Sequence, residues 1–97
     1  MQEDHLLWLQ NWYYNHCNGD WEHGSLIHID TIDNPGWSVT INLENTNLHD
    51  KEFQKIKLEL TNDNWLFCQV RSNKFEGRCG PLNLLEILQI FRNWAES

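Results

Sequence analysis

Apolar and polar side chains alternate along Trp37-Ser38-Val39-Thr40-Ile41-Asn42-Leu43-Glu44, near the middle of a chain of 97 residues. Successive side chains of a β-strand point to opposite faces, so this stretch predicts a strand with one buried and one solvated face. Residues 56–60 and 66–71 alternate in the same way and predict two more strands of the same sheet. In these strands we expect Leu58 and Leu66 to face the core.

One more strand is predicted before this stretch, over residues 26–32, which are rich in β-branched side chains. Asn34-Pro35-Gly36 follows, with Pro and Gly where a type II turn favours them, so strands 26–32 and 37–43 are predicted to form a hairpin. Asn62-Asp63-Asn64 predicts a second short turn, whereas residues 45–52 are a longer polar link. Four strands in this order predict an antiparallel meander.

Both ends of the chain have the apolar spacing of helices. Residues 4–17 place apolar side chains three or four positions apart, with Asp4 as the predicted N-cap. Residues 83–95 repeat this pattern, and Asn83 followed by Glu86 resembles a capping box. The order α-β-β-β-β-α predicts an α+β fold in which a four-stranded antiparallel meander sheet has the N- and C-terminal helices packed on one face.

The composition limits the classes of function. With 40% hydrophobic residues, the chain can bury one core but is too short for two, so residues 1–97 are predicted to form a single domain. Seven Lys and Arg against fourteen Asp and Glu give a net charge of −7. This charge disfavours nucleic acid as a partner, because phosphate contacts require a basic surface, and it fits a basic protein partner better.

Location and redox state can also be predicted. No apolar run approaches the roughly 20 residues that cross a bilayer, so no membrane association is expected. The start, Met1-Gln2-Glu3-Asp4, is acidic where a secretory signal is basic, which indicates a cytoplasmic protein. Cys17, Cys68 and Cys79 are an odd number of cysteines without a Cys-x-x-Cys pair, and we expect reduced thiols.

The meander predicts which loops lie together. The segments before the first strand, between the second and third strands and after the fourth strand would meet at one end of the sheet, where a rigid scaffold often presents binding residues. Acidic side chains there would attract a basic partner, and the aromatic Trp21 and Phe75 would anchor it. Alternatively, the aromatic side chains belong to the core and the charges are merely solvated. The predicted partner-binding residues are Asp20, Trp21, Glu22, His23, Asp50, Glu52, Lys74, Phe75 and Glu76.

The solvated face of the sheet is a second candidate surface. Trp65 and Phe67 are predicted to point away from the core, near Lys57, Gln69 and Arg71. Aromatic residues beside Arg are common anchors of protein interfaces. This assignment depends on register, because a shift of one residue would bury the two aromatic side chains.

Two groups of residues suggest catalysis instead. Cys79 precedes a predicted helix whose backbone dipoles could lower a thiol pKa, as a thiol-dependent, sulfurtransferase-like enzyme requires. The potential metal ligands between His16 and His28 could serve a metal-dependent enzyme. Neither group matches a recognised motif, and the predicted strand order lacks the alternating β-α-β units of a sulfurtransferase-like fold. We therefore expect a non-catalytic protein without a cofactor or bound metal.

Five stretches together resemble a known family. They are Leu6-Leu7-Trp8-Leu9-Gln10-Asn11-Trp12-Tyr13, Asn18-Gly19-Asp20-Trp21-Glu22-His23, Thr31-Ile32-Asp33-Asn34-Pro35-Gly36-Trp37-Ser38-Val39, Asn73-Lys74-Phe75-Glu76-Gly77 and Gly80-Pro81-Leu82-Asn83-Leu84. In these motifs and their order, the chain resembles the immunity protein 53 family of bacterial polymorphic-toxin systems over nearly its whole length. The resemblance implies a small cytoplasmic protein that binds and neutralises a cognate toxin domain and so protects the producing cell. It implies no particular contact residues.

Overall fold

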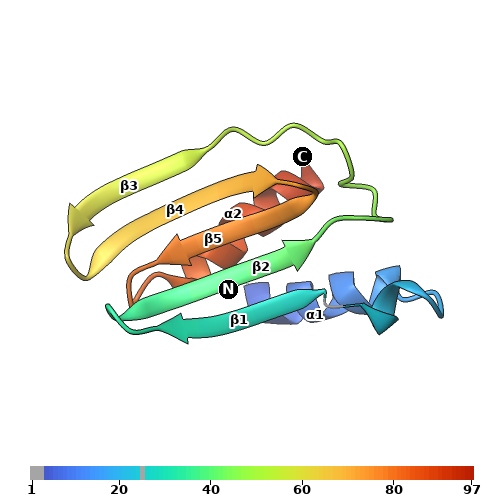
Figure 1. The fold of residues 1–97 in the computed structure, drawn as a ribbon, viewed down its shortest axis with the longest axis horizontal. Helices are drawn as coiled ribbons and strands as arrows, with labels where there is room; N and C mark the ends of the chain where they lie inside the picture. The colour runs from blue at the N-terminus through green and yellow to red at the C-terminus, as the bar shows by residue number, and fades with distance from the viewer. Residues whose placement is uncertain (1–3, 25) are drawn as a thin grey trace.

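The computed structural model describes residues 4–24 and 26–97, so Met1, Gln2 and Glu3 of the acidic start lie outside the described residues. The described residues form two α-helices, a 3₁₀ helix and five strands. In chain order these are α1 (His5–His16), η1 (Trp21–His23), β1 (Ile27–Ile32), β2 (Gly36–Asn42), β3 (Ile56–Thr61), β4 (Asn64–Arg71), β5 (Lys74–Cys79) and α2 (Leu84–Glu96). The strands form one antiparallel sheet in the order β1-β2-β5-β4-β3, and both helices lie behind it in Figure 1.

The predicted meander of four strands is wrong, because residues 74–79 form a fifth strand rather than a loop. β4 turns back at Ser72 and Asn73, whose φ angles of 54° and 60° lie in the left-handed region that tight hairpin turns use. β5 then lies between β4 and β2 and pairs with both. The strands β3, β4 and β5 are a meander, and the β1–β2 hairpin joins them through β5.

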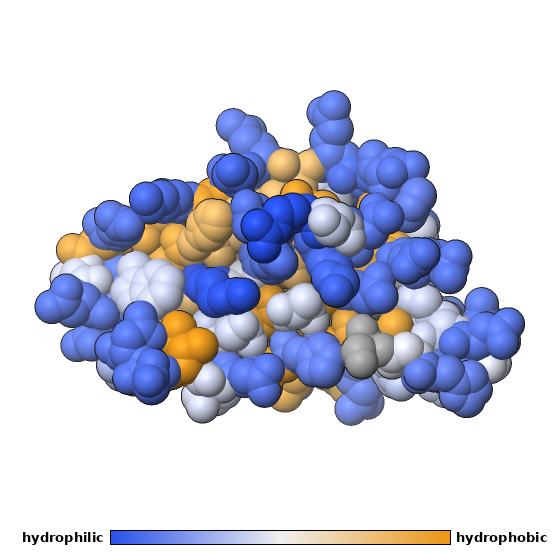
Figure 2. All heavy atoms as spheres, viewed as in Figure 1, coloured by the Kyte–Doolittle hydropathy of each residue, from blue (hydrophilic) through white to orange (hydrophobic). Residues whose placement is uncertain are grey.

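The register confirms which side chains share a face. Val39, Gly77 and Cys68 lie opposite one another across β2, β5 and β4, on the side that faces the helices. Phe67 lies on the other side, opposite Arg78, as predicted for the solvated face. This outer face is mostly hydrophilic, as Figure 2 shows.

Phe91 of α2 is fully buried at the centre of the core, between the sheet and the other helix. Its ring centroid is 5.1 Å from that of Phe75 in β5 and 5.2 Å from that of Trp12 in α1. Gly77 of β5 lets α2 approach the sheet, because a Cβ at this position would stand 2.7 Å from Cγ2 of Ile87. These contacts hold both helices on the same face, as predicted.

At the edge strand β3, the predicted face is right and the predicted burial is wrong. Leu58 lies opposite Leu66 of β4 on the helix-facing side, but Leu58 is 47% exposed whereas Leu66 is 3% exposed. Leu60, two residues further along, is 67% exposed. The reason is the reach of the helices: α2 lies behind β4 and β5 and leaves β3 uncovered (Figure 1).

The helix ends confirm one predicted cap and correct the other. Asp4 caps α1, since its side chain accepts a hydrogen bond from the backbone N–H of Leu7 at 2.8 Å. Asn83 precedes α2 but turns its side chain toward the sheet: its Oδ1 accepts the backbone N–H of Trp65 at 3.3 Å, and its Nδ2 donates to Glu86 at 2.6 Å. Asn83 therefore joins α2 to β4. Neither helix of the described residues is long and apolar enough to cross a membrane.

The hairpin of β1 and β2 forms as predicted, with a different turn. The Asn34–Pro35 peptide bond is cis, and Gly36 is the first residue of β2 rather than part of a type II turn. Position 36 must be glycine, because a Cβ there would clash with the carbonyl oxygen of Cys79. Between β3 and β4 the short turn lies at residues 62–63, which confirms the predicted connection.

Candidate partner-binding surface

Two of the three predicted segments, before β1 and after β2, meet at one end of the sheet, but of the third only the turn at Asn73 lies there, because residues 74–79 form β5. The backbone N–H of Asn42, at the end of β2, donates to the carbonyl of Leu26, just before β1, at 2.7 Å. The N–H of Leu43 donates to the carbonyl of Asn73, in the turn before β5, at 2.8 Å. A hollow of about 220 Å³ at this end is lined by residues on both sides of η1, among them Asp20 and Gly24, and by Asn42, Glu44 and Asn45 at the end of β2 and after it. We call this region the loop end.

The turn that leads into η1 is held by its own polar side chains. Asn18 Oδ1 accepts the backbone N–H groups of Asp20 and Trp21, both at 3.0 Å. The Glu22 carboxylate accepts the N–H groups of Asn18 at 2.9 Å and Gly19 at 2.6 Å. Hydrogen bonds from backbone N–H groups, its own first and then those of Asn18 and Gly19, lower the pKa of Glu22. Glu22 is therefore ionised at neutral pH and is engaged in shaping the turn.

The two aromatic residues of the predicted site belong to the core. Trp21 is 5% exposed, and its ring lies 5.8 Å from Trp12 and 5.6 Å from Tyr13 of α1, between ring centroids. Its Nε1 has no hydrogen-bond partner among the described residues. Phe75 is fully buried because it lies in the central strand β5, not in a loop. The expectation that both side chains stand in exposed loops is therefore wrong.

Asp50 and Glu52 lie beside the C-terminus of α2. Lys51, between them, donates from Nζ to the carbonyl oxygens of Trp94 and Ser97, both at 2.8 Å, and so satisfies the end of that helix. The indole N–H of Trp94 donates to the carbonyl of Glu52 at 2.7 Å. The side chains of Asp50 and Glu52 remain exposed. The link between β2 and β3 is thus anchored, and the carboxylates of Asp50 and Glu52 face solvent.

Lys74 and Glu76 lie on the outer face of the sheet, where β5 carries them. Glu76 accepts a hydrogen bond from Gln69 at 2.8 Å and pairs with Arg71 at 3.3 Å, and its side chain is only 17% exposed. Lys74, at the start of β5, is exposed. The same face carries the half-buried Phe67. Glu76 therefore belongs with the second candidate surface rather than with the loop end.

Charge is segregated within the chain, a feature that the sequence interpretation missed although it can be read directly. All seven Lys and Arg occur from Lys51 onward, whereas eight of the fourteen Asp and Glu occur within residues 1–50. The described part of residues 1–50 builds α1, η1, β1 and β2, which we call the acidic side. The exposed carboxylates in or beside these elements are Asp4, Asp20, Asp30, Asp33 and Glu44.

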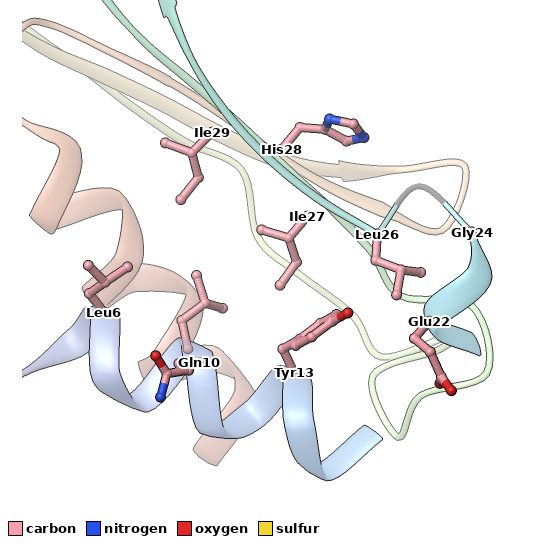
Figure 3. Close-up of a pocket in the computed structure, with 10 residues that line it drawn as sticks. Leu6, Gln10, Tyr13, Glu22, Gly24, Leu26, Ile27, His28 and Ile29 are labelled. Carbon is pink, nitrogen blue, oxygen red and sulfur yellow. The ribbon is translucent and has the colours of Figure 1, made fainter. Parts of the chain in front are cut away.

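A groove of about 650 Å³ lies on the acidic side, between α1 and the edge strand β1. Figure 3 shows Ile27 and Ile29 pointing from β1 toward α1, where Leu6 and Tyr13 line the opposite wall, while His28 points away. Leu6 is 56% exposed, so the groove is open to solvent. Sequence patterns could not reveal the groove, because it depends on how α1 is placed against β1.

A model of the immunity protein 53 family matches residues 6–96, which extend from the first turn of α1 to the end of α2. The chain belongs to the immunity protein 53 family. This match confirms the resemblance carried by the sequence motifs. No curated protein and no solved structure matched the chain.

In this member of the immunity protein 53 family, Cys79 is not placed as a reactive thiol. It is fully buried in β5, and burial raises its pKa, which keeps the thiol protonated at neutral pH. Cys68, opposite Gly77 on the same face, is buried as well, and its pKa is raised to about 12. For Cys79, burial outweighs the lowering of the pKa by a hydrogen bond with the Trp37 backbone, so the lowered thiol pKa that the sequence suggested is wrong.

The histidines of the predicted metal cluster lie apart in this immunity protein 53 fold. His16 ends α1, where its Nδ1 donates to the carbonyl of Trp12 at 2.8 Å and its Nε2 lies 3.2 Å from Oδ1 of Asn47. His28 is exposed on the outer side of β1. Within residues 4–24 and 26–97, no three His, Cys, Asp or Glu side chains are arranged to hold a metal ion. The metal-dependent alternative therefore gains no support from the geometry.

Proposed function

We propose that this immunity protein 53 family member binds a cognate toxin domain of a polymorphic-toxin system in the bacterial cytoplasm and blocks it without catalysing a reaction. Membership of an immunity protein family supports a toxin-neutralising role. The observation that carries the proposal furthest is the segregation of charge, because residues 1–50 contain eight carboxylates and no Lys or Arg. Such a surface attracts a basic protein and repels nucleic acid and anionic membranes.

Inhibition then follows from occlusion. Of the partner-binding residues predicted from sequence, the exposed ones are Asp20, His23, Asp50, Glu52 and Lys74, and these remain our proposed polar contacts. A stable complex buries about 800 Å² per partner, which is more than the turn around η1 can supply. The contact must therefore extend along the acidic side, where the groove between α1 and β1 provides the apolar surface that Trp21 and Phe75 do not.

Charge reversal at the loop end tests the proposal. Asp20→Lys with Glu44→Lys should slow association with the toxin encoded by the neighbouring gene by about 10-fold or more, and producing cells should lose protection. The matched control, Glu59→Lys with Asp63→Lys, makes the same change in net charge at the β3 side of the sheet and should protect like the wild type. The free energy of unfolding of both variants should lie within about 0.5 kcal/mol of that of the wild type.

Three results would overturn the proposal. One is equal protection by both charge-reversal variants, which would show that the acidic side is not the docking surface. Another is turnover of a substrate by the purified chain alone, because occlusion requires no chemistry. A toxin that fails to bind the wild-type chain would also contradict it.

A further inference from the structure

The outer edge of β1 exposes backbone hydrogen-bonding groups. The N–H of Asn42 donates to the carbonyl of Leu26, and the register of β1 with β2 runs unbroken from Ile27 opposite Ile41 to the end of the strand. Bonded pairs alternate along an antiparallel ladder, so the N–H and C=O groups of Ile27, Ile29 and Thr31 point away from β2. No other strand of the described residues pairs with that side, because β1 is the last strand of the sheet.

The two edges of the sheet differ in how they resist pairing. At the β3 edge the register shifts between Glu59 and Thr61, and Lys55 and Lys57 stand in or beside the strand. A bulge and lysines are the devices that natural proteins use to keep a sheet edge from pairing with another chain. β1 has neither: its residues are Ile-His-Ile-Asp-Thr-Ile and its register is regular. The β1 edge is therefore the one open to a further strand.

The groove supplies apolar contacts directly below this edge. A strand added beside β1 would place every second side chain on the helix-facing side, over Leu6 and Tyr13 of α1 and next to Ile27 and Ile29 (Figure 3). The intervening side chains would lie on the outer side, beside Asp30. Backbone hydrogen bonds then provide affinity, and the groove provides specificity.

The charge around the groove indicates which kind of strand could pair with β1. The elements around the groove belong to residues 1–50, which contain no Lys or Arg. A second copy of this chain, paired through β1, would bring two acidic sides together, which is unfavourable. A strand whose apolar residues alternate with Lys or Arg matches both the groove and the carboxylates. We propose that an extended, basic segment of the toxin pairs with the edge of β1 and inserts its apolar side chains into the groove; this inference rests on the proposed function.

Amide hydrogen exchange on the full chain, alone and with the toxin domain, tests the backbone pairing. On binding, the exchange rates of the amides of Ile27, Ile29 and Thr31 should fall to about one tenth of their values in the free chain, or lower. The amides of His28 and Asp30, which already bond to β2, should change little and serve as internal controls. Unchanged exchange at all three outward amides in the complex would overturn the inference.

A helix variant tests the groove. Leu6→Arg should weaken toxin binding by about 10-fold or more, because it fills the groove with a charged side chain. Leu7→Arg is the matched control: Leu7 is the next residue of α1 and is 50% exposed, but it does not line the groove, so binding should stay within about 2-fold of the wild type. Equal affinities of the two variants would contradict docking in the groove.

Substitutions at Thr31 distinguish the contribution of its backbone N–H to toxin binding from that of its side chain. Thr31→Pro removes one outward N–H and leaves the ladder with β2 intact, so it should weaken binding, whereas Thr31→Ala keeps the N–H and should bind normally. If the toxin binds the Leu6 and Thr31 variants as tightly as the wild type, while Asp20→Lys with Glu44→Lys still reduces protection, the strand inference fails and the proposed function stands. A dimer of the chain alone that protects the same three amides would assign the edge to a second copy and overturn the inference.

Discussion

Glu22 shows how a carboxylate in the predicted site serves the fold first. Its pKa is lowered by backbone N–H groups, so the carboxylate stabilises the turn above its ordinary pKa of 4.5, and this stabilisation disappears as the pH falls through the lower folded-state pKa. Glu22→Gln should therefore lower the melting temperature at pH 7. The difference from the wild type should shrink in melts recorded toward pH 3, because the wild-type carboxyl then becomes neutral as well.

The control for this variant is Glu44→Gln, at an exposed position of the same acidic side. It should leave the melting temperature unchanged at every pH. A loss in Glu22→Gln that is the same at pH 7 and pH 3 would show that the shape of the side chain, rather than its charge, holds the turn.

At the level of single residues, sequence patterns predict what depends on neighbours and miss what depends on the rest of the fold. Asp4 caps α1 as predicted, because an N-cap needs only the first turn of its own helix. Trp21 looks like an exposed loop anchor in the sequence, yet α1 covers it with Trp12 and Tyr13. Asn83 bonds to β4, a partner far along the chain, and so departs from the capping box.

At the level of elements, β5 shows which signal was available and overlooked. Phe75, Gly77 and Cys79 alternate with charged residues, which is the strand pattern, and Ser72-Asn73 can form a two-residue hairpin turn. The sequence interpretation instead placed these residues in the segment after the fourth predicted strand. The pairing of β5 with β2 was not accessible, because nothing local specifies that a hairpin inserts beside a strand that precedes it by more than 30 residues.

Leu66 of β4 is buried whereas Leu58, opposite it in β3, is half exposed, and this difference gives a prediction about stability. Leu66→Ala should reduce the free energy of unfolding by about 2–5 kcal/mol, because it empties a buried site in the core. Leu58→Ala removes the same atoms directly opposite but, at 47% exposure, should cost about 1 kcal/mol or less. Urea unfolding of the two variants measures this difference, and equal losses would mean that the β3 edge is covered in solution.

For the whole molecule, the candidate surface could be predicted only in part. The convergence of loops at one end follows from antiparallel strand order, and it survives the addition of β5 because one more hairpin leaves the ends of β2 and β4 where they were. The segregation of charge was readable from the sequence, but its meaning required the fold, which places α1, η1, β1 and β2 at one side of the molecule. The groove required the packing of α1 below β1.

This charge distribution predicts how association with the toxin responds to salt. Electrostatic attraction acts before contact and is screened over about 10 Å at 0.1 M ionic strength. Raising NaCl from about 50 to 500 mM should therefore slow association by about 10-fold or more and change dissociation by about 3-fold at most. Asp30→Asn with Asp33→Asn removes two of the exposed carboxylates and should make the salt dependence shallower, as stopped-flow kinetics can measure. An association rate that is independent of salt would show that the acidic side does not steer the toxin.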